Sequence, residues 1–195
     1  MARASTTPSK AGPKKIHARL NSDTWLDRSL KLLSKRGPGA LTLDSLTKHL
    51  KVTTGSFYWH FKNHAQFLDQ LTDKYIEDYT AVVAKHLASL ELTPREKLVE
   101  ASRLIISQEL SALDVHFRAL AIAYPKLQPK IRAMDEFRTE VIQGIFEDMG
   151  YRGDDLLMRV HTFVVLHSME SPVSTCLPPE DRLRLLEQRI ALLAD

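Results

Sequence analysis

The twelve residues VTTGSFYWHFKN, numbered 52–63, decide how the N-terminal part of this chain is expected to fold. Val52, Phe57 and Phe61 can pack on one side of a short helix that begins near Thr53 and ends around Phe61. The first turn of that helix, residues 53–56, carries only small or polar side chains, so its backbone can approach another molecule closely.

Two more helices are expected before this one, and a tight turn joins the second to the third. A first helix over residues 22–36 ends at Gly37, which suits a left-handed cap. Thr42 is placed to cap a second helix over residues 43–50, and residues 51–53 form the turn. This arrangement predicts a helix-turn-helix, a motif whose second helix enters the major groove of DNA.

In such a motif the first turn of the second helix reaches base edges, and polar residues beyond it donate to flanking phosphates. None of the expected base-facing residues is Arg, Asn or Gln, so no particular base sequence is predicted. Phe61 is expected in the core. The base-facing candidates are Thr53, Thr54, Gly55 and Ser56, and the phosphate-facing candidates are Tyr58, His60 and Lys62.

The charges are divided unevenly along the chain. Residues 1–62 contain twelve Lys or Arg and three Asp or Glu, whereas the remainder contains fifteen and twenty-one. This division favours a polyanion-binding module attached to a different kind of domain, although a solvated basic surface would have the same composition. Residues 1–20 lack the apolar side chains that offset the entropy of ordering, so we expect a flexible basic arm.

Helical periodicity continues along the rest of the chain, and no stretch has the pattern of a β-strand. Thr93-Pro94-Arg95-Glu96 has the form of a capping box, which marks the start of a helix. We expect an all-α fold with a helix-turn-helix domain over residues 21–63 and a helical regulatory and dimerisation domain over residues 64–195. The later helices are expected over residues 64–89, 94–112, 114–123, up to 149, 154–169 and 179–194, with a loop over residues 171–178.

Several classes of function are not expected. The single cysteine, Cys176, excludes an intramolecular disulfide and a thiolate metal cluster within one chain. No apolar run is long enough to cross a bilayer, and we expect a cytoplasmic protein without membrane contact. The chain has no glycine-rich phosphate loop, nucleophile elbow or zinc-helix signature, so no enzyme, cofactor or metal is predicted. His60 and His64 have the spacing of a metal pair, but we expect a helix boundary between them.

Residues 39–46, GALTLDSL, together with residues 52–63, resemble the tetracycline-repressor family of bacterial regulators. The family pattern is Gly, Thr or Ser, an apolar residue, Tyr, any residue, His or Tyr, then Phe. Residues 55–61 meet every element of this pattern. The resemblance covers about residues 24–71, and beyond them it is only architectural.

This resemblance implies both residue roles and a function. It assigns backbone contacts to Thr42, Tyr58 and His60, and groove-facing positions to Thr54 and Ser56. It also implies a homodimer on a palindromic operator in double-stranded DNA, formed mainly through the last two long helices. A small-molecule effector in the second domain would release the dimer, so a repressor is predicted.

Three positions depart from the family pattern. Thr47, Lys51 and His64 stand where the family usually has Ala, Gly and Lys. Lys51 lies where the turn often needs a left-handed residue, which costs on the order of 1 kcal/mol for a residue other than glycine. His64 replaces a phosphate contact with a group only partly charged at neutral pH, and Lys62 can substitute for it.

The second domain is expected to hold an effector cavity and a dimer interface. For each cavity candidate, ordinary core packing is the alternative. The expected cavity residues are Phe117, Leu120, Tyr124, Phe137, His161 and Val164. Apolar stripes on the last two helices predict a four-helix bundle with a second copy. The expected interface residues are Leu157, Val160, Val164, Leu183, Leu186 and Ile190.

A second function remains open at this point. The missing Arg, Asn or Gln at the base-facing positions is also compatible with an accessory or protein-interaction factor whose helix-turn-helix no longer binds a defined operator.

Overall fold

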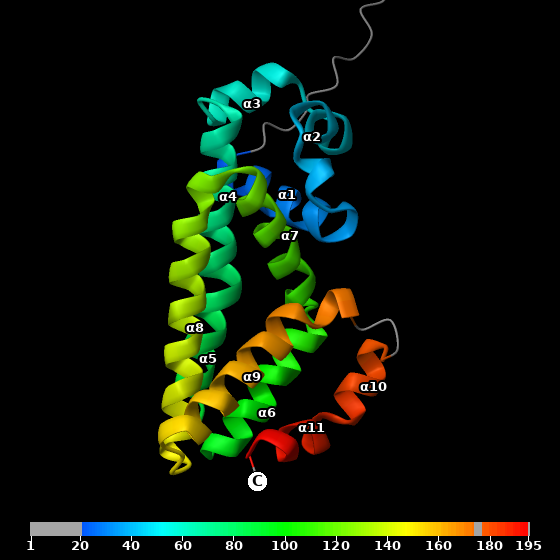
Figure 1. Cartoon of the computed structure of the whole chain (residues 1–195). Coiled ribbons are helices and arrows are strands. Elements are labelled where there is room, and N and C mark those ends of the chain that lie inside the picture. Colours follow the sequence, from blue (N-terminus) through cyan, green and yellow to red (C-terminus); the bar gives the residue numbers. More distant parts are fainter. Residues whose placement is uncertain (1–20, 174–176, 195) are drawn as a thin grey trace, which may run out of the picture.

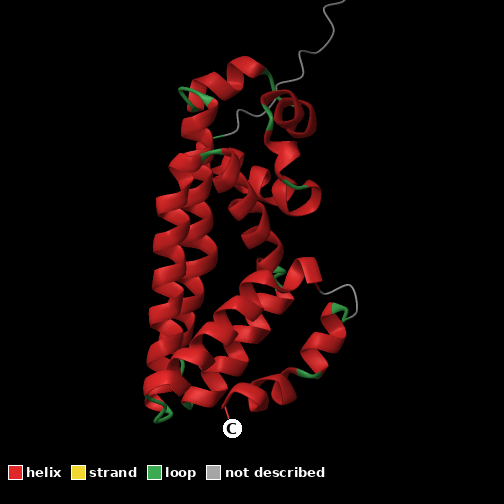
Figure 2. Cartoon of the chain, in the orientation of Figure 1, coloured by secondary structure: helices red, strands yellow, loops and turns green. Residues whose placement is uncertain are grey.

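The computed structural model describes residues 21–173 and 177–194, and of residues 171–173 the backbone alone. The expected flexible arm, residues 1–20, lies outside the described residues, as does part of the expected loop at residues 171–178. Throughout the described ranges the elements are helices and no strand occurs (Figure 2). The all-α prediction is therefore confirmed.

The N-terminal helices form where the sequence predicts them. Asn21 caps the first helix by accepting the Thr24 N–H at 2.8 Å, and Gly37 ends it with a φ of 73°. Thr42 and Thr53 cap the two helices of the predicted motif, and Lys51 takes the left-handed conformation between those helices. The elements are α1 Ser22–Arg36, η1 Pro38–Leu41, α2 Leu43–Leu50 and α3 Thr54–His60.

The expected long helix over residues 64–89 is present, but one turn of it is π-helical. It consists of α4 His64–Tyr75, η2 Ile76–Ala81 and α5 Val82–Ser89, and the dihedral angles remain helical at both junctions. We call this continuous unit, residues 64–89, the lever helix. Single π-helical turns are rare and frequently occur at functional sites.

The remaining helices differ from the expected ones in three places. The helix expected over residues 154–169 continues to Val173, so the first three residues of the loop expected over 171–178 are helical. Glu109 is left-handed, with a φ of 52°, so the helix expected over residues 94–112 ends at Ser107 and the next begins at Leu110. The helix expected over residues 179–194 is broken at Leu185, whose ψ is 11°. The elements are α6 Pro94–Ser107, α7 Leu110–Ala123, η3 Pro125–Leu127, α8 Gln128–Asp148, α9 Gly153–Val173, α10 Pro179–Arg184 and α11 Leu186–Ala194.

The arrangement of these helices separates two ends of the molecule. Helices α2 and α3 lie at one end, and α10 and α11 lie at the other (Figure 1). The lever helix and α8 run along one side between these ends (Figure 1). Among the described residues, no helix is both long enough and apolar enough to cross a membrane.

Two hydrophobic cores fill the molecule. The upper core joins α1 and α3 to α4, α7 and the start of α8, so it continues across the expected domain boundary at residue 63. Phe61 and Phe67 meet there on either side of that boundary, with their ring centroids 5.1 Å apart. The lower core packs α5, α6, α8, α9 and α11 together. The helix-turn-helix is therefore packed directly onto the first half of the lever helix.

Candidate nucleic-acid interface and interior cavity

Buried aromatic rings set the orientation of α3. Phe57 and Phe61 are fully buried on its inner side. Trp25 of α1 meets both rings edge-on, with centroid distances of 5.7 and 6.2 Å. Because both ends of the inner side are held in this way, the opposite side of α3 points outward at the end of the molecule.

The outer side of α3 begins with small polar residues. The Thr53 hydroxyl accepts the Ser56 N–H at 3.2 Å, while Thr54 and Gly55 are exposed. A Cβ atom added to Gly55 would meet nothing closer than the Thr53 hydroxyl, at 3.8 Å, so internal packing does not require glycine there. The absence of a side chain therefore leaves space for a molecule outside the chain.

Two large aromatic side chains follow on the same helix. Tyr58 is 55% exposed and Trp59 is 69% exposed, whereas large aromatic side chains are usually mostly buried. The sequence predicted a contact role for Tyr58 but singled out no such role for Trp59. The sequence does contain a sign of this exposure. Trp59 lies two positions from both Phe57 and Phe61, so a helix that buries these two rings directs Trp59 to the opposite side.

Polar and basic residues surround this helix. Thr42 is exposed, and its hydroxyl accepts the Ser45 N–H at 3.4 Å. Lys48, Lys51 and Lys62 are exposed as well. Helix starts with free polar groups beside lysines are suited to bind phosphates.

His60 and His64 are both half-buried. The Nε2 atom of His60 is buried without a hydrogen-bond partner among the described residues. Only the rest of its ring is available for the predicted phosphate contact. The Nε2 atom of His64 lies 2.7 Å from the Leu41 carbonyl oxygen, so this ring links α4 to η1. The expected helix boundary does fall between the two histidines, since α3 ends at His60 and α4 begins at His64.

A cavity of about 80 Å³ is lined by residues of the lever helix, α6, α7, α8 and α9. Of the six residues predicted to line it, the structure places Phe137 and Val164 there. Phe117 and Leu120 are instead buried in the upper core, and Tyr124 and His161 are exposed. Helical periodicity identified their apolar faces but not which of two cores each face contacts.

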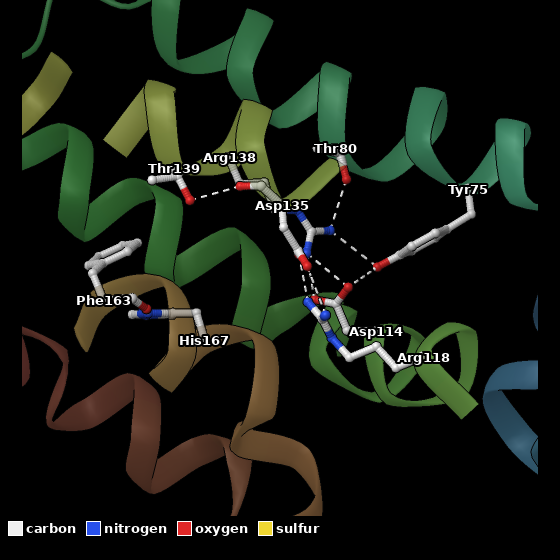
Figure 3. Close-up of polar contacts among 9 residues, drawn as sticks. All are labelled: Tyr75, Thr80, Asp114, Arg118, Asp135, Arg138, Thr139, Phe163 and His167. Carbon is white, nitrogen blue, oxygen red and sulfur yellow. Dashed lines mark hydrogen bonds and ion pairs between the residues drawn. The ribbon is translucent and has the colours of Figure 1, made fainter. Parts of the chain in front are cut away.

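A buried polar network forms one wall of the cavity (Figure 3). The Arg138 guanidinium donates to both Asp114 carboxylate oxygens, at 2.8 and 2.7 Å. It also donates to the Tyr75 hydroxyl at 3.2 Å and to the Thr80 hydroxyl at 2.8 Å. The Tyr75 hydroxyl donates in turn to Asp114 at 2.6 Å. The network therefore joins the π-helical turn of the lever helix to α7 and α8.

Burial and charge both act on the ionisable groups of this network. Burial raises the pKa of the Tyr75 hydroxyl, and the neighbouring Asp114 charge raises it further. Burial lowers the pKa of Arg138, but the charge of Asp114 and the hydrogen bonds from Arg138 outweigh that effect and raise it. Arg138 therefore stays charged and Tyr75 stays neutral. The sequence did not predict this network, because its hydrogen-bonded partners are 24 or more residues apart along the chain.

The opposite wall carries His167, which is 5% exposed. Its ring stacks on Phe163 at a centroid distance of 4.1 Å, and its Nδ1 atom lies 2.8 Å from the Phe163 carbonyl oxygen (Figure 3). Burial lowers the pKa of His167 to about 4, and the nearby Arg189 charge lowers it while the Phe163 hydrogen bond opposes the change. The ring is therefore neutral at pH 7.

The predicted interface residues do not share one free surface. Val160, Leu186 and Ile190 are buried in the lower core of the same chain, and Leu183 packs against that core half-buried. Val164 lines the cavity, and only Leu157, 61% exposed, faces outward. The outward face of α9 instead exposes a different apolar set, which consists of Leu157, Met158, Val165, Leu166 and Met169.

Comparison with known proteins gives a family match for the N-terminal helices. Residues 26–71 match the model of the bacterial regulatory proteins of the tetR family. The chain is 39% identical over 54 residues to the class D tetracycline repressor protein of Escherichia coli. That match covers 28% of this chain and spans about a quarter of the repressor's length, 25%.

Solved structures share the fold over most of the chain. A protein from Rhodococcus sp., assigned to the TetR family of transcriptional regulators, is 19% identical with a TM-score of 0.72. The match covers 89% of this chain and 98% of that one. AibR, solved in complex with isovaleryl coenzyme A and operator DNA, is 14% identical with a TM-score of 0.66. Here the match covers 89% of this chain and 97% of AibR.

Proposed function

We propose that this chain, whose residues 26–71 match the tetR-family model, is a transcriptional regulator that represses transcription as an effector-responsive homodimer on a palindromic operator. The observation that carries the proposal is α3, whose inner side is fully buried while its polar first turn and two large aromatic residues are exposed. The proposed site of action is the cytoplasm, and the proposed function involves no catalysis.

In the proposed complex, α3 lies in the major groove with its first turn against base edges. Thr53, Thr54, Gly55 and Ser56 are the base-facing residues, and Tyr58 and Trp59 lie beside them on the exposed side. These residues carry hydroxyls but no bidentate donors, so the predicted base preference is modest.

The sugar–phosphate backbone is proposed to contact the residues around α3. Thr42, Lys51 and Lys62 are exposed there and supply donors and positive charge. Lys62 takes the phosphate role that His64 cannot fill, because the His64 ring is engaged with the Leu41 carbonyl. His60 is proposed to contribute only through the part of its ring that is not buried.

The homodimer is proposed to form through the outward face of α9. Met158, Val165 and Met169 recur there at helical spacing, with Leu157 and Leu166 beside them, and all are exposed. Five exposed apolar side chains on one side of a helix, with only His161 and Thr162 exposed between them, are typical of an interface. Twofold pairing of this face would bring two copies of α3 to one side of a DNA duplex.

Effector control is proposed to act through the lever helix. The cavity is lined by residues of η2 and α5, and the same continuous helix shares the upper core with α3. An effector that binds one lever position better than another changes the separation of the two α3 helices in a dimer. The Tyr75–Asp114–Arg138–Thr80 network lies at the junction and is proposed to carry this coupling.

The proposal is tested by operator binding of two matched variants. Fluorescence anisotropy with duplexes from the region upstream of the chain's own gene measures the affinity. Tyr58→Phe removes an exposed hydroxyl beside the first turn of α3, and we expect binding to weaken about fivefold, the value of one hydrogen bond. Tyr124→Phe removes an exposed hydroxyl at the end of α7 and should leave the affinity unchanged. Equal affinities in all three proteins would refute the assigned contact.

The same assay separates the alternative function, an accessory factor with a degenerate helix-turn-helix. Competition with unrelated DNA at about 50 and 200 mM salt distinguishes specific from purely electrostatic binding. A regulator retains a preference for its own upstream DNA at the higher salt. Binding that is equal for all sequences and disappears at the higher salt would favour the accessory factor.

A further inference from the structure

The cavity constrains the chemistry of the effector more narrowly than the proposed function does. Its wall is mostly apolar, with side chains from six elements, including Val83, Leu87, Ile105, Ile142 and Phe163. The apolar part of the wall cannot hydrate or pair a charged ligand, and it favours the burial of apolar surface.

The charged groups of the wall already neutralise each other. Asp114 and Arg138 form a pair with two hydrogen bonds, and the second guanidinium nitrogen of Arg138 is engaged by Tyr75 and Thr80. A carboxylate ligand would have to displace Asp114 from Arg138, and a cationic ligand would have to displace Arg138 from Asp114. Either exchange leaves a buried charge without a partner, which is strongly unfavourable.

His167 provides a hydrogen-bond acceptor rather than a charge. A carbonyl oxygen can only accept, so the Nδ1 atom of His167 carries the proton that is donated to the Phe163 carbonyl. In a neutral imidazole the other nitrogen, Nε2, then holds a lone pair. His167 lines the cavity, and among the described residues no group donates a hydrogen bond to this lone pair, so it is open to a donor from a ligand.

We propose that the effector is an uncharged, largely apolar molecule whose O–H or N–H group donates a hydrogen bond to Nε2 of His167. This inference rests on the proposed function in treating the cavity as the effector site. The hydrogen bond fixes the orientation of the ligand, and the apolar wall contacts the rest of it.

As it stands, the cavity is smaller than a single benzene ring requires, so a ring-sized ligand has to widen it. Its 80 Å³ is roughly half the ~150 Å³ of an engineered cavity that admits benzene. Phe137 lines the cavity and also lines a surface groove with Ile76 and Met134. Its side chain is 39% exposed, so outward rotation of this one ring both opens a path and enlarges the space.

Three probes of similar size test the proposal by calorimetric titration of the full chain at pH 7.5. Phenol offers a hydroxyl donor, toluene has a methyl group in its place, and benzoate carries a charge. We expect phenol to bind five- to tenfold more tightly than toluene, which is the effect of about one hydrogen bond. Benzoate is expected to bind at least tenfold more weakly than toluene.

Matched variants assign the preference to His167. His167→Leu should bind phenol and toluene equally, whereas Ser168→Ala, which alters another polar residue of the wall, should keep the preference for phenol. His167→Phe retains a ring against Phe163, and it replaces the Leu variant if circular dichroism shows that the Leu variant is unfolded.

Several results would overturn the proposal. These are benzoate binding as tightly as phenol, phenol binding no better than toluene, persistence of the preference in both His167 variants, and no binding of any probe. Operator binding without probe is measured separately by anisotropy. If the protein without probe does not bind the operator, the proposed function is refuted. If it binds the operator but binds no probe, only this assignment of the effector is refuted.

Discussion

A single buried histidine makes the stability of this protein depend on pH. Burial lowers the pKa of His167 from 6.5 to about 4 in the folded chain. Below pH 6.5 the unfolded chain binds a proton that the folded chain does not bind, so the free energy of unfolding falls as the pH falls. We expect a loss of ~3 kcal/mol between about pH 6.5 and 4, measured by urea denaturation.

The His167→Leu variant isolates this contribution. Burial also lowers the pKa of His116, so part of the acid sensitivity has a second origin. Subtracting the free energy of unfolding of the variant from that of the wild type at each pH removes the contribution of His116, which both proteins share. Parallel curves for the wild type and the variant over this range would show that His167 titrates normally.

Lys51 carries a conformational cost that a substitution can remove. Its φ of 56° and ψ of 45° lie in the left-handed region, where side chains with a Cβ atom are strained. We expect Lys51→Gly to raise the free energy of unfolding by about 1 kcal/mol in urea denaturation. The lost charge should reduce the slope of operator affinity against salt by about one unit.

Lys48→Gly is the matched control for this prediction. Lys48 is also exposed and basic, but it lies inside α2, where glycine costs about 1 kcal/mol. The two variants should therefore change stability in opposite directions. A loss of stability in both would mean that the turn does not strain Lys51.

Single residues with local partners could be read from the sequence, and those with distant partners could not. The cap at Thr42, the end at Gly37 and the left-handed turn at Lys51 all depend on groups within a few residues. The role of His64 depends on the Leu41 carbonyl, 23 residues away. Such contacts depend on tertiary packing, so local sequence patterns do not predict them.

The same division holds for whole elements. The capping box at Thr93 and Glu96 marked the start of α6, and both of its hydrogen bonds are present. The π-helical turn of the lever helix was not predicted, because residues 76–81 keep an ordinary helical pattern. In the structure, the Thr80 hydroxyl in this turn accepts a hydrogen bond from Arg138. The turn therefore coincides with a long-range contact that sequence periodicity does not contain.

The ion pair between Arg138 and Asp114 is expected to stabilise the contact of the lever helix with α7 and α8. Arg138→Met leaves Asp114, which is 3% exposed, as a buried carboxylate without its guanidinium partner. We expect a loss of about 3–5 kcal/mol in urea denaturation. The double variant Asp114→Asn with Arg138→Met removes both charges and should recover most of that loss.

An exposed ion pair provides the comparison. Arg184 pairs with Asp181 at the surface, so Arg184→Met should change the free energy of unfolding by less than about 1 kcal/mol. If the Arg138 variant were as mild as this one, the junction would not depend on the buried charge pair. If the double variant were as unstable as Arg138→Met alone, packing rather than an unpaired charge would explain the loss.

For the whole molecule, the sequence did not predict which apolar helix faces pack inside the chain and which stay exposed. Helix α9 is apolar on both sides, since Val160 and Phe163 face the lower core while Met158 and Val165 are exposed. Periodicity finds such faces but cannot say which one the chain itself covers. Charge and motif predicted two domains with a boundary at residue 63, whereas the upper core packs the helix-turn-helix and the lever helix together.

The proposed dimer makes the last prediction. Val165→Glu places a charge in the middle of the exposed apolar face of α9, where pairing with a second copy would bury it without a partner. We expect sedimentation equilibrium to show dimers of the wild type and monomers of this variant at micromolar concentration. Because the proposed operator has two half-sites, its affinity for the monomeric variant should fall at least a hundredfold.

Val82→Glu is the matched control, because Val82 is 53% exposed and lies on the lever helix instead of α9. The same change of charge there should leave both the dimer and operator binding unchanged. A dimer that survives Val165→Glu would exclude this face of α9 as the interface, and dissociation by both variants would mean that added charge alone separates the copies. Only dissociation confined to the α9 variant ties the loss of operator binding to this surface.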